Sequence, residues 1–377
     1  MPGFELIGKE EKKNIDEIFS KSNGVLFAHG FDKLRKKIFR VRNFEKQLQN
    51  KFRSKYCQVV SSGTAAIKVA LKAIGIKPGD EVITQSFNFI ATIEAILDCG
   101  AKPIITNIDD SLNMCPKDLE RRMTKKTKAV IPVHMLGFSA NLFEISKICK
   151  KNKIFMIEDN CEAVGAKYGN KYLGTIGDAG ILSFDYGKNI TTGEGGAILT
   201  NNKSIFINSK EYHDHGHQLN PKFPRGMDTV KIPGFNYRMS ELQAAVGLAQ
   251  LKKLNYIIKE NKRRYKVLEK NLSKKFKIRE CNKNSFPSYD TFIFEVNDKK
   301  ARDKIVKILK LNNIGTKNLP DAIKWHFASF WKHAIGKKEV KKVKNSHEKI
   351  QRHIAVPILL KKKISDYDFV AKKIFNS

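Results

Sequence analysis

The chain has 377 residues, of which 41% are hydrophobic, so it can bury a sizeable core and, on size alone, form two domains. No run of about 18 apolar residues is present to span a bilayer, and the first residues lack the basic-then-apolar plan of a signal peptide. We therefore expect a cytoplasmic protein with no membrane partner. The net charge of +33 comes from lysines spread along the chain, which favours solvated helix faces and an anionic substrate over a nucleic-acid partner.

The cysteines and histidines give no metal-binding pattern. Six cysteines are scattered singly, as expected for thiols in a reducing compartment. The histidines of one crowded run alternate as His213, His215 and His217, but no further ligand of recognisable spacing accompanies them. We therefore predict no metal site.

Short apolar runs alternate with amphipathic stretches along most of the chain, which is typical of an α/β domain with a mostly parallel sheet. We predict strands over residues 57–60, 81–84, 103–106, 129–133, 154–157, 180–184 and 197–200. We predict helices over residues 64–74, 90–99 and 142–150. A capping box from Ser240 to Gln243 begins a long helix that runs on toward Tyr256.

After about residue 250 the alternation loosens into lysine-rich helices and a few short strands, such as residues 289–296. This change predicts a large domain over residues 1–250 that carries the site, and a smaller C-terminal α+β domain over residues 251–377.

Lys188 lies between a short apolar strand and a Gly-rich turn. A lysine in such a place can be desolvated enough to work as an uncharged amine, and can form a Schiff base with an aldehyde cofactor. This chemistry suggests pyridoxal phosphate, with Lys188 as both tether and proton shuttle. The alternative is a solvated surface lysine, because the chain holds 71 Lys and Arg residues.

Three other segments meet the demands of such a cofactor. Gly63 and Thr64 lie between a strand and a helix, where backbone amides can hold a phosphate group. Asp159 ends a strand, where a carboxylate can keep a pyridine nitrogen protonated. Phe87 and Phe89 are candidates to stack on the ring. Each has an ordinary alternative: a helix cap, a turn-capping aspartate and core aromatic residues.

Four segments in this order resemble the motif set of the DegT/DnrJ/EryC1/StrS sugar aminotransferases: residues 61–66, 158–163, 183–196 and 234–245. The resemblance covers nearly the whole chain. It implies the type I pyridoxal-phosphate-dependent aminotransferase fold, and a homodimer with active sites at the subunit interface.

The resemblance also implies roles for individual residues. Lys188 binds the cofactor covalently, Asp159 pairs with the pyridinium nitrogen, and Phe89 stacks on the ring. Asn236 is expected to reach across from the neighbouring subunit. The phosphate is expected to be held by Gly63, Thr64 and Ser183.

Glu162 departs from the family pattern, because the family more often has glutamine near the cofactor ring at this place. An extra carboxylate beside the phenolate oxygen is unfavourable unless it is protonated or turned away.

Within the family, a few segments are similar to the branch that aminates the terminal carbon of an oxidised 3-deoxy-manno-octulosonic acid: residues 1–6, 214–217, 325–326 and 331–333. We therefore expect transfer of an amino group from glutamate to this anionic sugar, giving the 8-amino-3,8-dideoxy acid for lipopolysaccharide. Candidate substrate contacts are His134, His215, His217 and His326.

Three other functions are weighed against this one. A nucleotide-sugar aminotransferase making a 4-amino-4,6-dideoxyhexose, as perosamine synthases do, shares every cofactor motif. A 3-dehydratase branch carries histidine at the position of Lys188, so the lysine disfavours dehydration. A non-catalytic basic protein that kept the fold is disfavoured by the presence of both Lys188 and Asp159.

Overall fold

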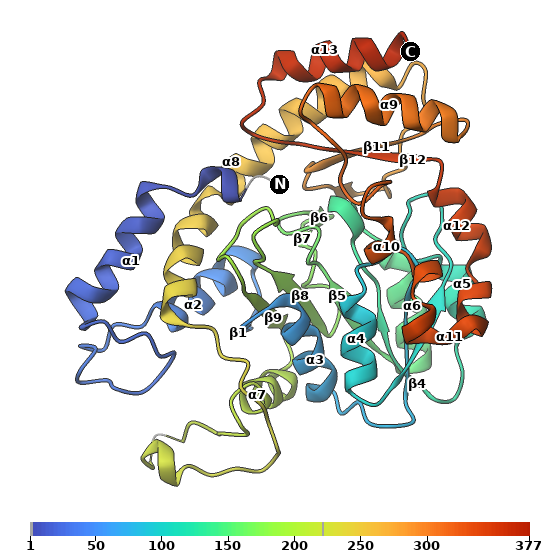
Figure 1. The fold of residues 1–377 in the computed structure, drawn as a ribbon. Helices are drawn as coiled ribbons and strands as arrows, with labels where there is room; N and C mark the ends of the chain where they lie inside the picture. Colours follow the sequence, from blue (N-terminus) through green and yellow to red (C-terminus); the bar gives the residue numbers. More distant parts are fainter. Residues whose placement is uncertain (1–2, 221) are drawn as a thin grey trace.

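The computed structural model describes residues 3–220 and 222–377, and within them seven strands form one central sheet (Figure 1). In sheet order the strands are β1 (Tyr56–Val60), β9 (Gly196–Thr200), β8 (Ala179–Ser183), β5 (Phe155–Asp159), β4 (Thr127–Ile131), β2 (Glu81–Gln85) and β3 (Lys102–Thr106). Strand β9 is antiparallel to both its neighbours, and the other neighbouring pairs are parallel. The predicted mostly parallel sheet is therefore confirmed.

Helices cover both faces of this sheet, because successive residues of each buried strand point to opposite sides. On β8, Ile181 packs into the core beneath one set of helices and Leu182 into the core on the opposite face. One face is covered by α3 (Gly63–Ala73), α4 (Ala91–Asp98) and α7 (Lys203–Tyr212). The other face is covered by α2 (Arg40–Phe52), α5 (Pro116–Arg122), α6 (Leu142–Asn152) and the first half of α8 (Glu241–Leu272).

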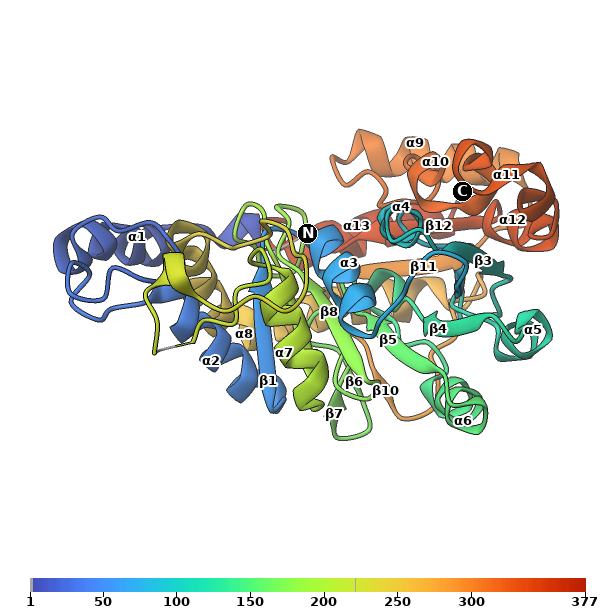
Figure 2. The same ribbon diagram turned by 90° about the horizontal axis from the view of Figure 1, so that it is seen from below.

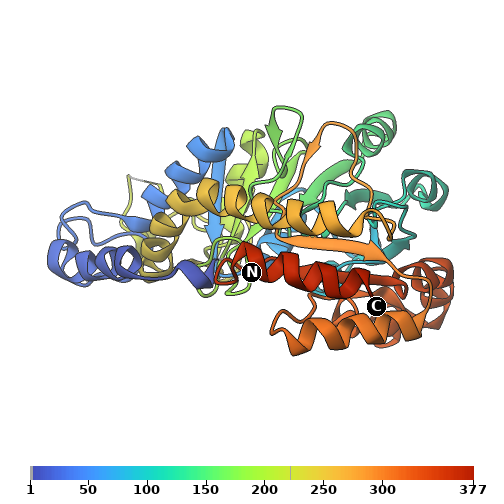
Figure 3. The same cartoon turned by 90° about the horizontal axis from the view of Figure 1, so that it is seen from above.

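Helix α8 begins at the predicted capping box, where the Ser240 hydroxyl accepts from the amide of Gln243 and the Gln243 side chain accepts from the amide of Ser240. It does not end near Tyr256 but continues to Leu272, because its buried apolar face extends through the second half of the helix. The predicted domain boundary at residues 250/251 lies inside this helix. Helix α8 packs against α1 (Lys9–Ser22) at one end and α13 (Ile364–Phe375) at the other (Figure 3).

The C-terminal part, residues 273–377, lies beside the carboxyl-end edge of the sheet (Figures 1 and 2). Its strands β11 (Thr291–Glu295) and β12 (His353–Pro357) are antiparallel and pack with α9 (Lys299–Leu311) and α13 around an apolar core. Its remaining helices are α10 (Ile323–His326), α11 (Lys332–Lys341) and α12 (Lys344–Ile350). A small sheet joins both parts of the chain through β6 (Lys167–Tyr168), β7 (Lys171–Tyr172) and β10 (Ser285–Phe286).

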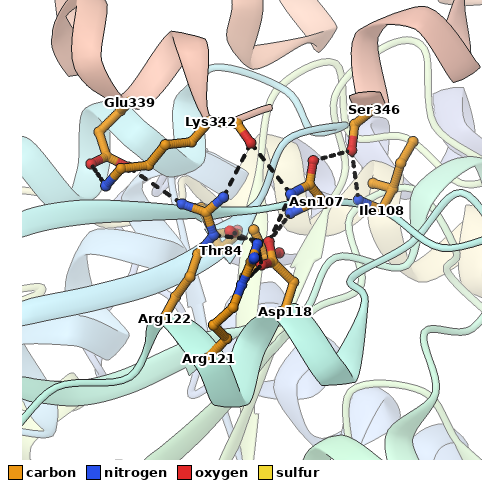
Figure 4. A network of polar contacts seen from close by, with 10 residues as sticks. Thr84, Asn107, Ile108, Asp118, Arg121, Arg122, Glu339, Lys342 and Ser346 are labelled. Atoms are coloured by element: carbon orange, nitrogen blue, oxygen red, sulfur yellow. Dashed lines mark hydrogen bonds and ion pairs between the residues drawn. The ribbon is translucent and has the colours of Figure 1, made fainter. Parts of the chain in front are cut away.

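A polar network attaches α11 and α12 to the large sheet (Figure 4). Asp118 on α5 accepts from the backbone and side-chain amides of Asn107 at 2.7 and 2.9 Å, and from Arg122 at 2.8 Å. Arg122 in turn donates to the backbone oxygen of Lys342 at 3.2 Å. Ser346 donates to the Asn107 side chain at 2.7 Å. The network therefore fixes the position of the C-terminal part relative to the sheet.

No helix among residues 3–220 and 222–377 combines the length and the apolar character that a bilayer crossing requires.

Candidate active site

A cavity of about 730 Å³ opens at the carboxyl ends of the parallel strands, beside the start of α3 and beneath the C-terminal part. This is the edge at which open α/β sheets bind ligands. Most of the predicted cofactor residues meet there, because they follow different strands that end at the same edge. The lining includes Gly63, Phe89, Asp159, Glu162, Ser183 and Lys188.

Lys188 lies in the loop after β8, with 14% of its side chain exposed, and its Nζ atom forms an ion pair with Oε1 of Glu162. Burial by itself lowers the pKa of this amine, but the adjacent Glu162 carboxylate outweighs burial and holds the pKa of Lys188 above its usual range. The ion pair with Glu162 therefore opposes the uncharged form of the amine that desolvation alone would favour. This carboxylate lies on a different loop.

Glu162 is paired with two lysines, Lys188 and Lys317, while its contact with the cofactor ring stays a prediction. Its side chain is 7% exposed, and Oε2 lies 3.4 Å from Nζ of Lys317 on the opposite wall. Burial raises the pKa of Glu162, but the charges of Lys188 and Lys317 together bring it well below its usual range. Two cations therefore compensate the extra carboxylate.

Asp159 ends β5 and is 3% exposed. Its Oδ2 atom accepts a hydrogen bond from the hydroxyl of Thr92 at 3.0 Å, and its Oδ1 atom accepts from the amide of Cys161 at 3.1 Å. The carboxylate is thus fixed in one orientation at the cavity wall. This arrangement suits a partner for a protonated ring nitrogen.

The start of α3 forms a cradle for an anionic group. Helix geometry leaves the amides of Gly63 and Thr64 without acceptors inside the helix, while the Ser62 hydroxyl caps the amide of Ala65 at 3.0 Å. A Cβ atom at position 63 would lie 2.8 Å from Cβ of Ser183, so only glycine leaves the space. Gly63, Thr64 and Ser183 all line the cavity, and this cradle fits a phosphate group.

Phe89 and His326 form one side of the cavity, with their ring centroids 5.2 Å apart. His326 arrives there because residues 325–327 pair with the loop after β2: its backbone oxygen accepts from the amide of Asn88 at 3.0 Å. Its Nδ1 atom donates to the backbone oxygen of Ala322 at 2.8 Å, and burial lowers the pKa of the ring. The imidazole is therefore a neutral group with Nε2 available as an acceptor.

Comparison with known proteins identifies the family. The sequence profile of the DegT/DnrJ/EryC1/StrS aminotransferase family matches residues 32–375. The chain belongs to this family. It is therefore a transferase, and pyridoxal phosphate is the cofactor for which its cavity is built.

Relatives and solved structures agree with this assignment. The aminotransferase is 35% identical to GDP-perosamine synthase of Escherichia coli O157:H7, over 66% of this chain and 68% of the relative. It is 32% identical to the spore coat polysaccharide biosynthesis protein SpsC of Bacillus subtilis, over 98% and 94% of the two chains. A solved DegT DnrJ EryC1 StrS aminotransferase from Brucella abortus superposes with a TM-score of 0.80 at 25% identity, covering 97% and 95% of the chains.

Five candidate site residues of the aminotransferase lie outside the cavity lining, and one of them, Phe87, is buried in the core. His134 is fully buried: Nδ1 accepts from the amide of Ala140 at 3.1 Å, so Nε2 donates to Glu158, also at 3.1 Å. His215 and Asn236 are exposed, and His217 is half-buried with Nδ1 3.6 Å from Asp228. The role of Asn236 toward a neighbouring subunit stays a prediction.

Among the cavity-lining residues that sequence reasoning missed, Thr92 and Lys317 contact the predicted site residues Asp159 and Glu162. Thr92 lies in the first turn of α4, close to the predicted aromatic loop, and a search for hydroxyl groups near Phe89 would have found it. Lys317 carries no local signal, because it is one of 71 basic residues and its neighbours form no motif.

Proposed function

We propose that the protein transfers an amino group from glutamate to the keto carbon of a nucleotide-linked 4-keto-6-deoxyhexose, giving a 4-amino-4,6-dideoxyhexose. One observation carries the transaminase chemistry: a half-buried lysine and a buried aspartate, Lys188 and Asp159, line one cavity with the α3 phosphate cradle. The sugar class is supported by the GDP-perosamine synthases of Escherichia coli O157:H7 and Vibrio cholerae, at 35% and 31% identity.

Different residues of the chain are proposed to hold the cofactor and to move the proton. The bound cofactor supplies an electron sink for negative charge at the reacting carbon. Gly63, Thr64 and Ser183 would hold its phosphate, Phe89 would pack on its ring, and Asp159 would keep its ring nitrogen protonated. Lys188 would bind the cofactor covalently and, once released, would move a proton at the reacting carbon.

The oxidised octulosonate expected above is the second candidate, and one observation favours it. Of the residues behind that expectation, His326 lines the cavity, where a neutral imidazole can bind a sugar hydroxyl. Others give it no support: Trp331 is 1% exposed in the core, His215 lies outside the cavity, and Met1 and Pro2 lie outside the described residues. The relatives therefore outweigh this candidate.

A competition assay tests the choice. The enzyme loaded with pyridoxal phosphate receives glutamate and equal concentrations of a GDP-linked 4-keto-6-deoxyhexose and an 8-oxidised 3-deoxy-manno-octulosonate. We expect kcat/KM for the nucleotide sugar to exceed that for the octulosonate by at least about 100-fold. The reverse preference would establish the octulosonate reaction. Amination of neither sugar, with glutamate still converted, would reject both.

The homodimer, the cytoplasmic location and the place in lipopolysaccharide synthesis remain part of this proposal. Sedimentation of the purified protein tests the first of them directly. A monomer that is fully active would contradict the shared active site and the role of Asn236.

A further inference from the structure

Four charged side chains of alternating sign form a buried line across the cavity wall. Lys188 pairs with one oxygen of Glu162, and the other oxygen lies 3.4 Å from Nζ of Lys317. Lys317 is itself held by Asp290, with 2.6 Å between Nζ and Oδ2. The side chains of Glu162, Lys317 and Asp290 are 7%, 10% and 1% exposed.

The two lysines come from different parts of the chain. Lys188 follows β8 of the central sheet, whereas Lys317 lies between α9 and α10 in the C-terminal part. The backbone amide of Lys317 donates to the oxygen of Ala355 on β12 at 2.9 Å, so the base of the side chain is fixed as well as its tip. Glu162 therefore contacts both Lys188 and Lys317, and Lys317 is fixed in the C-terminal part.

The charges of these four side chains sum to zero only while Lys188 is a free ammonium group. When Lys188 binds the cofactor, its nitrogen enters a new bond and Glu162 loses an independent cationic partner. A carboxylate that is 7% exposed would be costly without any cation beside it, and would then take up a proton or rotate. Its second oxygen has no hydrogen-bond partner among the described residues, and the cation that faces this oxygen is Lys317.

We propose that Lys317 is a positioning residue that keeps Glu162 ionised and fixed in the cavity wall while Lys188 is engaged by the cofactor. Asp290 holds Lys317 in place for this purpose. The role concerns the cofactor rather than the sugar, so it does not depend on which sugar is the substrate.

The test measures binding of pyridoxal phosphate alone to the full-length protein, by its visible absorption at one fixed pH, with no sugar present. Lys317→Met leaves Glu162 without its counter-cation, and we expect cofactor binding at least about 10-fold weaker, with an altered absorption spectrum. Adding Glu162→Gln removes the charge that needs compensation. The double variant should therefore bind the cofactor within about 3-fold of Glu162→Gln alone, with the same spectrum.

Two further variants separate this role from a structural one. Lys317→Arg keeps the cation and should bind the cofactor nearly as well as the wild type. Cofactor binding by Lys317→Met, with and without Glu162→Gln, is also measured in protein that carries Asp290→Asn. Removal of Lys317 then leaves no unpaired carboxylate at position 290, so any effect comes from Glu162. If Lys317→Met fails to fold, as circular dichroism would show, Lys317→Gln replaces it throughout.

The outcomes are distinct. Rescue by Glu162→Gln supports the proposal, because a loss caused by disrupted packing at Lys317 would not respond to the charge at position 162. Normal cofactor binding and spectrum in Lys317→Met would overturn it. The proposal would also be overturned if the Lys317→Met/Glu162→Gln variant bound the cofactor as weakly as Lys317→Met, both with Asp290 and with Asp290→Asn. Failure of the sugar assay would leave these results unaffected, so the two proposals are tested separately.

Discussion

The hydroxyl of Thr92 donates a hydrogen bond to Asp159, with 3.0 Å between Oγ1 and Oδ2, inside the cavity wall. Thr92→Val keeps the shape of the side chain but removes this donor, which is worth roughly 1.5–3 kcal/mol when the acceptor is charged. The carboxylate is then free to rotate away from the ring nitrogen. We expect kcat to fall about 10-fold in a glutamate half-reaction followed by absorbance.

Thr92→Ser is the matched control, because it keeps the hydroxyl and should retain most of the activity. Equal losses in Thr92→Val and Thr92→Ser would mean that the methyl group and its packing matter, and that the hydrogen bond to Asp159 does not.

Replacement of Lys188, the proposed reacting lysine, should abolish turnover. Lys188→Ala removes both the tether and the proton carrier, so we expect kcat to fall at least about 1,000-fold. Reduction of the wild-type protein with borohydride in the presence of cofactor should label the peptide that contains Lys188, as mass spectrometry would show. The exposed Lys203 provides a control, since Lys203→Ala should change neither turnover nor labelling. Labelling at another lysine would remove Lys188 from the mechanism.

The network around Asp118 predicts a change in stability. Asp118→Ala removes an acceptor, 6% exposed, that serves Asn107, Arg121 and Arg122. Arg122 then keeps only the more distant carboxylate of Glu339, at 3.9 Å. We expect the free energy of unfolding to fall by about 3 kcal/mol in urea titrations. Arg121→Ala tests the exposed member of the same network.

The Arg121 side chain is 72% exposed, so its removal should cost less than about 1 kcal/mol. If Arg121→Ala and Asp118→Ala destabilise equally, the buried contacts to Asn107 and Arg122 do not hold the C-terminal part in place.

His353 predicts a pH dependence of stability. Its ring is 6% exposed on β12, and burial lowers its pKa to about 4, although the backbone oxygen of Lys349 at 2.9 Å opposes the shift. The unfolded chain takes up the proton first, because the unperturbed pKa of histidine is about 6.5. The contribution of neutral His353 is therefore complete above about pH 6.5 and is lost as the pH falls toward 4, by up to about 1.4 kcal/mol per pH unit.

His353→Gln should flatten the fall of the unfolding free energy between about pH 6.5 and 4, measured by denaturant titration at each pH. The exposed His333 gives the comparison, since His333→Gln should leave the slope of the wild type. If the unfolding free energy of His353→Gln falls with pH as steeply as that of the wild type, other groups cause the loss of stability in acid.

The seven strands of the central sheet and the helices α3, α4 and α6 could be predicted because their signals are local. A buried strand shows as a short apolar run and a helix start as a capping box, so β8 and the start of α8 follow from neighbouring residues alone. The end of α8 could not be predicted, because lysine-rich turns continue as helix only where another element covers their apolar face. Helix α13 covers that face of α8, and it lies far from α8 in the sequence, at the C-terminal end of the chain.

The proposed cofactor residues follow from the sequence by the same logic, since Asp159 ends a strand, Gly63 and Lys188 follow within a few residues of a strand end, and parallel strands bring their carboxyl ends to one edge. The amino acids by themselves thus determined the fold and the family, and pointed to Lys188 as the proposed reacting lysine. Only the tertiary structure decided which charged groups surround that lysine, because Glu162 and Lys317 come from other segments of the chain. Electrostatic energy depends on distance in space and on burial, and sequence separation encodes neither.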